Sequence, residues 1–311
     1  MITASAFSPC GISSFFEVPE LDVKDPRLLG SRGGGFCIEK GVKVKVTLKP
    51  LGGVKRYVIK TYMNGSERDL YVAKASALRV LKLVKGGYEV KIEQDIGCPI
   101  GCGFGTSGAS ALATALALSK ALNLKLNLWQ VAEIAHVVEV ECCTGLGTVA
   151  GLITGGVVVV KEPGAPREGS TLRIPLTREE ELMIVAASFR SVEKYKVLLS
   201  REAMERVNAV GRMALKEVLR KPTLETFLKA AKFFTERSGL ASPLVRKAIK
   251  VAEGRGALVA LQNMIGEAVH AVVPLSKVDE VREALSELTP NVIVSRIYQR
   301  GLKDLKALTR V

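Results

Sequence analysis

The stretch "PIGCGFGTSGASALATALAL", residues 99–118, decides the fold, because it joins a glycine-rich turn to an Ala/Leu-rich run. Glycines let the backbone adopt positive φ and approach a ligand closely. Hydroxyl side chains at the start of a helix cap it, and the free N–H groups there bind anions. We therefore expect Thr106 and Ser107 to cap a buried helix over residues 107–122, behind a loop that holds the phosphates of a nucleotide.

The chain before this loop predicts mostly strands, and the chain after it predicts mostly helices. Residues 1–95 carry alternating and β-branched runs, with turns expected at 33–35 and at Asn64-Gly65, and residues 88–96 form the strand that enters the loop. A helix is expected after Asn127, and the glycine-rich segment 144–156 is expected to be a loop. Further helices are expected over 69–84, 200–219, 223–237, 243–253 and 276–287, with strands over 157–161, 181–188 and 291–298.

Composition bounds the class of protein. The 311 residues are 48% hydrophobic, enough for two lobes or one large α+β unit, and carry a formal net charge of +14. Scattered Lys and Arg and an aromatic content of 5% argue against a nucleic-acid partner, whereas a basic surface attracts small anionic substrates. The apolar run 109–121 contains Ser and Lys and is too short to span a membrane. The N-terminus lacks a basic segment followed by an apolar block, which predicts a cytoplasmic location.

The cysteine spacing and the absence of two common nucleotide-binding motifs exclude several kinds of site. The six cysteines include no CxxC pair, so buried free thiols are expected rather than a zinc site, with an intracellular disulfide as the alternative in a hyperthermophile. The loop lacks the Gly-Lys-Ser/Thr of a Walker A sequence. Thr106 interrupts the GxGxxG pattern of a dinucleotide fold, so the loop fits neither class.

The loop pattern P-x-G-x-G-x-G-T-S-G-A resembles the second motif of the GHMP kinases, the superfamily of galactokinase, homoserine kinase and mevalonate kinase. Further stretches, in the right order along the chain, are similar to the archaeal pantoate kinase family. They are "AFSPCGISSFFEV" (6–18), "LLGSRGGGFCIEKGV" (28–42), "AHVVEVECCTGLGTVAGLITGGVVVVKEPGAP" (135–166) and "ALVALQNMIGEAVHAVVP" (257–274). The last of these resembles a Met-Leu-Gly helix start.

This resemblance implies an α+β, two-lobed GHMP kinase fold with the active-site cleft between an N-terminal lobe (1–175) and a C-terminal lobe (176–311). It implies that ATP, with Mg²⁺, phosphorylates the 4-hydroxyl of pantoate to 4-phosphopantoate in coenzyme A biosynthesis. It also implies a homodimer, with no nucleic acid and no membrane as partner.

The resemblance assigns roles to residues of several stretches. The loop that wraps ATP comprises Pro99, Gly101, Gly103, Phe104, Gly105, Thr106, Ser107, Gly108 and Ala109. Ser107 and Glu139 would hold Mg²⁺, and His136, one helical turn before Glu139, would face the same side and contact the substrate. Ser31 and Arg32 would bind the pantoate carboxylate, because an Arg fork matches a planar carboxylate, and Lys161 keeps a charge where the family has Arg. A core histidine and a surface turn are the alternatives for His136 and for Ser31-Arg32.

Two positions depart from the family pattern. Thr148 stands where the family has a catalytic Asp, and Cys10-Gly11 stands where it has Gly-His. No Asp occurs between Asp95 and Asp279. Losing a general base slows a reaction by about 10²–10⁴-fold without forbidding phosphoryl transfer, so a kinase remains expected. The alternatives are a GHMP kinase for another small hydroxy acid or alcohol, of the homoserine or mevalonate type, and a catalytically silent nucleotide-binding relative.

Overall fold

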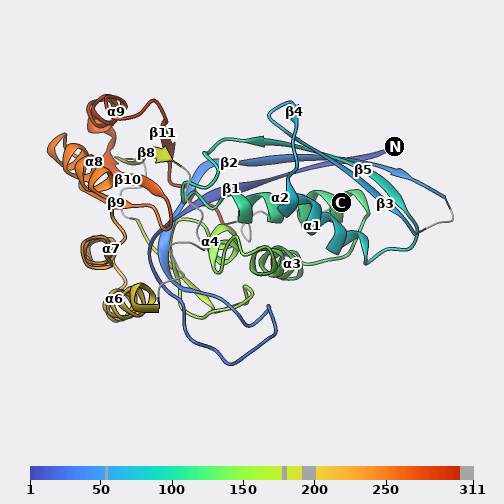
Figure 1. The fold of residues 1–311 in the computed structure, drawn as a ribbon, viewed down its shortest axis with the longest axis horizontal. Coiled ribbons are helices and arrows are strands. Elements are labelled where there is room, and N and C mark those ends of the chain that lie inside the picture. The colour runs from blue at the N-terminus through green and yellow to red at the C-terminus, as the bar shows by residue number, and fades with distance from the viewer. Residues whose placement is uncertain (53–54, 177–180, 191–200, 302–311) are drawn as a thin grey trace.

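The computed structural model describes residues 1–52, 55–176, 181–190 and 201–301, which form two sheets and the helices around them (Figure 1). In this part of the chain the first sheet has seven strands, in the order β4-β3-β5-β2-β6-β7 with β1 paired to β2. The second has four, in the order β11-β8-β10-β9. The strands are β1 (Ile2–Glu17), β2 (Arg32–Pro50), β3 (Tyr57–Met63), β4 (Ser66–Glu67), β5 (Tyr88–Ile96), β6 (Val157–Val160), β7 (Thr171–Ile174), β8 (Leu182–Arg190), β9 (Val259–Gln262), β10 (Glu267–Pro274) and β11 (Val292–Arg296).

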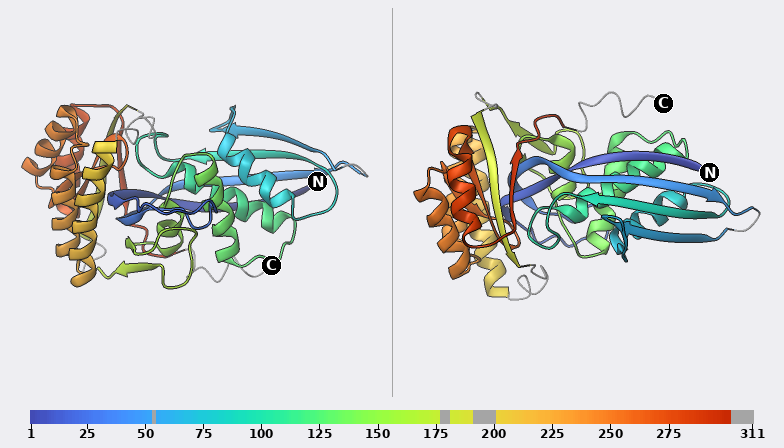
Figure 2. Two further views of the ribbon diagram at one scale, coloured as in Figure 1. Left: turned by 60° about the horizontal axis from the view of Figure 1, so that its bottom comes forward. Right: turned by 90° about the horizontal axis from the view of Figure 1, so that it is seen from above.

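The helices cover the two sheets in separate groups. Helix α2 (Thr106–Ala121) packs on β1 and β2, and α1 (Tyr71–Leu81) and α3 (Leu128–Glu141) pack on α2. Figure 2 shows the later helices gathered at the other end of the molecule. They are α6 (Arg201–Arg220), α7 (Leu224–Arg237), α8 (Pro243–Gly254) and α9 (Val278–Ser286), the last preceded by a short 3-10 turn, η2 (Leu275–Lys277). Helices α8 and α9 contact the second sheet, and α6 and α7 reach β1, so β1 touches both groups.

The expected α+β class and most of the expected elements are confirmed. Asn127 caps α3 and accepts a hydrogen bond from the Gln130 backbone, which completes a capping box. Asn64 and Gly65 turn the chain between β3 and β4 at φ 48° and 84°, as an Asn-Gly hairpin does. Strand β5 then pairs with β2 and leads into the glycine-rich loop before α2.

The turn expected at residues 33–35 is wrong, because these glycines lie inside β2. They pair with β6 on one side and with the end of β1 on the other. A Cβ on Gly34 would lie 2.7 Å from Cε1 of Phe15 and 2.5 Å from Cε2 of Phe227, so a larger residue would push β2 off its neighbours. The glycines therefore serve close packing within a sheet, which composition alone does not distinguish from a turn.

Two further expectations are wrong. The glycine-rich segment 144–156 was expected to be a loop, but it contains the short helix α4 (Thr148–Thr154), whose residues 149–154 are all buried. The helix expected to start at Met264-Ile265-Gly266 is instead a turn followed by β10, which pairs with β8 and β9. In both places contacts with strands and helices distant in sequence decide the structure, and glycine content or a short motif does not report such contacts.

The division that we expected near residue 175 stays a prediction. The first sheet ends with β7 at Ile174 and the second begins with β8 at Leu182, yet the chain returns to the first sheet after β11, where Ile38 bridges Ile297. Among the described residues, no helix combines the length and the apolar character needed to cross a membrane.

Candidate active site

The glycine-rich loop between β5 and α2 presents the N-terminus of a buried helix. Gly101, Gly103 and Gly105 adopt φ of 75°, 77° and 61°. Gly105 is the N-cap, with no side-chain cap bond, so the expectation that Thr106 and Ser107 cap this helix is wrong: they are its first two residues. A Cβ on Gly105 would lie 2.6 Å from Cγ2 of Thr148 and 2.8 Å from the carbonyl of Gly11, so the cap position has room for glycine alone.

The residues expected to bind the nucleotide are contiguous in this loop and the first turn of α2. The carbonyl of Phe104 accepts a bond from the backbone N–H of Gly11 at 3.1 Å, which fixes the loop against β1. The first N–H groups of α2 have no partner within the helix, and the helix dipole adds positive potential there. Thr106 is buried and Ser107 is half-buried. This arrangement suits the phosphates of a nucleotide.

Glu139 brings a buried carboxylate to the start of α2. Its side chain is 1% exposed. Oε1 accepts a hydrogen bond from the Thr144 hydroxyl at 2.9 Å, and Oε2 has no hydrogen-bond partner among the described residues. A Cβ on Gly108 would lie 2.7 Å from Oε2, so that oxygen faces the first turn of α2 directly. A buried carboxylate oxygen without a partner, beside the glycine-rich loop, fits a ligand of Mg²⁺.

Thr148 lies at the same point, as the first residue of α4. Its methyl group, Cγ2, would lie 3.2 Å from a Cβ on Gly108 and 3.8 Å from one on Gly11. The residue that replaces the expected Asp is therefore next to the loop, to α2 and to Gly11 of β1. Three stretches that are distant in sequence therefore meet here, around Gly11, Gly105–Gly108 and Thr148.

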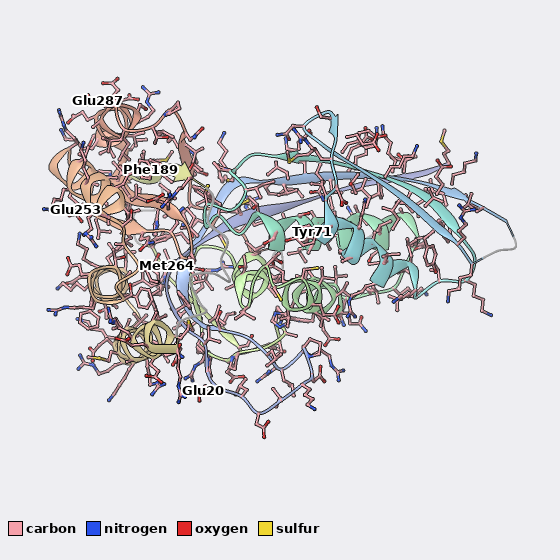
Figure 3. The ribbon with its side chains drawn as sticks, viewed as in Figure 1. Glu20, Tyr71, Phe189, Glu253, Met264 and Glu287 are labelled. Carbon is pink, nitrogen blue, oxygen red and sulfur yellow. The ribbon has the colours of Figure 1, made fainter. Side chains whose placement is uncertain are left out.

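A cavity of about 380 Å³ opens beside Thr148. Its lining includes the end of β1, the beginning of β2, residues 143–148, parts of α4 and β6, and the turn at Met264 and Ile265. Figure 3 labels Met264 at the junction of the two groups of elements. Among the described lining residues Arg32 is the one charged side chain, and Ile12, Phe15, Phe16, Leu146, Met264 and Ile265 are apolar. The cavity suits a small anion with an apolar body.

Arg32 is held at the cavity wall by a buried acid. Its NH2 group lies 2.6 Å from Oε1 of Glu17, which is 1% exposed, and Nε of Arg212 from α6 lies 3.3 Å from Oε2. Nε of Arg32 is buried and has no hydrogen-bond partner among the described residues. Ser31 lines the same cavity. The Arg32 side chain is 33% exposed, so its guanidinium can meet a carboxylate in the cavity while it also neutralises Glu17.

His136 and Lys161 lie outside the residues that line this cavity. Nε2 of His136 donates to the carbonyl of Leu29 at 2.9 Å, and the ring is buried. Burial lowers its pKa, against the opposing effect of hydrogen bonds to the Leu29 and Pro26 backbone, so the ring is neutral. The residue supports the segment that leads to Ser31 instead of pointing at the cavity. Lys161 follows the lining residue Val160 and is half-buried.

Some residues of the site were missed by the sequence analysis. Glu17, Thr144 and Gly145 received no role, although Glu17 ends an otherwise apolar run, which is a signal for a buried acid with a partner. The turn after β9 was quoted for its resemblance to a family motif, but none of its residues was given a role in the site. All six cysteines are free thiols; four are buried, Cys142 is half-buried and Cys143 is exposed at the cavity.

Comparison with known proteins identifies the family to which the chain belongs. Residues 70–156 match the model of the GHMP kinases N terminal domain. The pantoate kinase of Thermococcus kodakarensis is 30% identical over 94% of this chain and 95% of its own length. The pantoate kinase of Methanocaldococcus jannaschii is 32% identical over 54% of this chain and 58% of its own length.

Solved structures give the same result for the fold. A phosphotransferase related to the CoA biosynthesis pathway superposes with a TM-score of 0.83 at 26% identity, over 96% of both chains. A homoserine kinase from Cytophaga hutchinsonii superposes with a TM-score of 0.70 at 16% identity, over 97% of this chain and 96% of that one. The second likeness extends to the fold alone.

Proposed function

The chain belongs to the GHMP kinase family, and on that premise we propose that it transfers a phosphoryl group from ATP to the 4-hydroxyl of pantoate, giving 4-phosphopantoate for coenzyme A biosynthesis. The observation that carries the proposal is the free, buried Oε2 of Glu139, which faces the first turn of α2 beside a cavity with one cation, Arg32. A phosphate-binding helix start, a metal ligand and an anion-binding cavity are the parts that a kinase of a small acid needs.

The loop from Pro99 to Ala109 would hold the triphosphate through backbone N–H groups, and Ser107 with Glu139 would hold Mg²⁺. Mg²⁺ neutralises charge on the transferring phosphates. In the described residues no group of three or more His, Cys, Asp or Glu could hold a metal by itself. This fits Mg²⁺, which takes few protein ligands and completes its shell with phosphate and water.

The charge and the apolar lining of the cavity favour pantoate as the acceptor. Pantoate has a carboxylate and two methyl groups on the carbon between its hydroxyls. Arg32 and Ser31 would bind the carboxylate, and Phe15, Phe16 and Met264 offer an apolar surface for the methyl groups. Homoserine carries an ammonium group, and the described lining has no carboxylate for it, which favours pantoate. Lys161 and His136 would act at the margin of the site, His136 through the segment that carries Ser31.

The direct test is release of ADP from ATP with pantoate, homoserine and mevalonate as acceptors, in the presence and absence of Mg²⁺. We expect turnover with pantoate, and none above that of the Ser107→Ala/Glu139→Ala double variant with the others. Turnover of homoserine or mevalonate alone would reassign the acceptor.

A second candidate function, nucleotide binding without transfer, is favoured by one observation: Thr148 supplies no carboxylate at the position of the expected base. Calorimetry distinguishes it, because a silent relative binds ATP yet phosphorylates no acceptor. The expected cytoplasmic location and homodimer remain predictions; light scattering of the purified chain tests the dimer.

A further inference from the structure

A chain of buried hydrogen bonds runs from β1 through β10 to the glycine-rich loop. The Ser14 hydroxyl and Nε2 of His270 are 2.9 Å apart, and Nδ1 of His270 is 2.9 Å from Oδ1 of Asn263. Nδ2 of Asn263 donates to the carbonyl of Cys102 at 3.2 Å. Ser14, His270 and Asn263 are each 0% exposed. Strands β1 and β10, the turn that carries Asn263 and the glycine-rich loop are thus joined by side chains that water does not reach.

The direction of these bonds follows from the last one. A carbonyl can only accept, so Asn263 presents its NH₂ group to Cys102 and its oxygen to His270. Nδ1 of His270 therefore carries the proton, and Nε2 accepts from Ser14. Burial lowers the pKa of His270 to about 3, so the ring keeps this neutral form at physiological pH. Every bond in the chain then has one donor and one acceptor, which sets the orientation of the Asn263 amide.

The turn at Asn263 also packs tightly against the glycine-rich loop. Gly103 adopts a φ of 77°, and a Cβ there would lie 2.8 Å from Cβ of Asn263. A Cβ on Gly266 would lie 2.9 Å from the backbone N of Gly103. The backbone N–H of Met264 donates to the carbonyl of Ser13 at 2.9 Å, and both residues line the cavity. One turn therefore touches the loop on one side and the cavity wall on the other.

We propose that Asn263 is a positioning residue for the nucleotide loop, held in orientation by His270 and Ser14. Through it the C-terminal part of the chain sets where the loop and its N–H groups lie relative to the acceptor cavity. The proposal rests on the proposed function, since it assumes that the loop binds ATP. Asn263 itself lies behind the loop, with its amide bonded to protein atoms.

The test compares Asn263→Ala, His270→Phe and Ser14→Ala with Thr289→Val. Thr289 is a matched control, because its buried hydroxyl donates to the carbonyl of Ser188 at 2.9 Å in the same part of the chain, and its own hydrogen bonds do not reach the loop. Asn263→Ala removes both hydrogen bonds of the amide, and we expect loss of the one to Cys102 to raise KM for ATP about five- to tenfold, with kcat within about threefold. His270→Phe and Ser14→Ala should raise it less, in that order, and Thr289→Val should lower Tm and leave KM unchanged.

Hydrogen exchange of the amides in residues 98–105, measured on the free protein, is the second readout. Faster exchange there in Asn263→Ala or His270→Phe, and not in Thr289→Val, supports the proposal even if pantoate is not the acceptor. His270→Phe keeps a ring in place beside Phe36 and serves where Asn263→Ala fails to fold. Unchanged loop exchange together with an unchanged KM, or an unchanged calorimetric Kd for ATP, overturns the proposal.

Discussion

The hydroxyl of Thr144 donates to Oε1 of Glu139 at 2.9 Å, and this bond decides which oxygen of the buried carboxylate stays free. Because Oε1 is occupied, Oε2 is left facing Gly108 at the start of α2. Thr144 follows the C-cap Cys142 and Cys143 at the end of α3, and its backbone N–H also donates to the carbonyl of Glu139 at 2.9 Å. The end of one helix thus presents a single oxygen to the beginning of another.

Glu139→Gln tests the metal role of that oxygen. The substitution keeps the size of the side chain and removes its charge, so we expect kcat to fall by at least about 10²-fold, with a higher Mg²⁺ requirement. Tm without Mg²⁺ should be unchanged or higher, because a buried carboxylate oxygen without a partner is destabilising. Glu141→Gln, on the same helix and paired with Arg79 at the surface, is the control and should keep wild-type kinetics. A Glu139→Gln enzyme of normal kcat would contradict the metal assignment.

Gly108→Ala distinguishes an effect on catalysis from an effect on the stability of α2. Alanine favours the helix by about 1 kcal/mol over glycine, so the fold should be kept. The added methyl group would lie 2.7 Å from Oε2 of Glu139, where the metal is expected, and kcat should therefore drop about tenfold or more. Gly254→Ala, at the end of α8 with no atom within 4 Å of the new Cβ, should leave both kcat and Tm close to wild type. Calorimetry and steady-state kinetics on the three proteins decide the matter.

The sequence predicted helix starts and turns correctly where hydrogen bonds between residues close in sequence determine them. Asn127 with Gln130 predicted the start of α3, and Asn64-Gly65 predicted a tight turn, because both depend on bonds within a few residues. The glycines at 33–35 and the segment 148–154 were misjudged, because their structure depends on Phe227 and on burial between distant strands.

The sequence predicted which segments form the candidate site. It did not predict which side chains of those segments contact one another. The loop and Glu139 were identified from a motif and now lie together. The pairing of Arg32 with Glu17, the bond of His136 to Leu29 and the role of Asn263 join residues up to 161 positions apart, and one sequence holds no record of which distant residues touch.

Thr148→Asp tests whether the site lacks a base. An Asp at the first residue of α4 is favoured by the helix dipole and would lie beside Gly11 and the first turn of α2. General-base catalysis contributes about 10²–10⁴-fold, so we expect a clear rise in kcat, of about tenfold or more, with pantoate. Thr148→Asn offers the same shape without a base and should give no rise. Equal or lower rates in Thr148→Asp would show that this enzyme has adopted another arrangement.

The two buried histidines predict a loss of stability on mild acidification. Burial lowers the pKa of His270 to about 3 and also lowers that of His136, whereas both rings take up a proton near pH 6.5 once the chain unfolds. The unfolded state then binds more protons, so stability is fully present above about pH 6.5 and is lost as the pH falls below it. Between pH 7.5 and 5.5 the loss from His270 should be about 1.4 kcal/mol. Urea unfolding at the two pH values measures it, and His270→Phe should flatten this dependence while leaving the part that belongs to His136. A wild-type free energy of unfolding that is equal at both pH values would show that neither ring is held neutral.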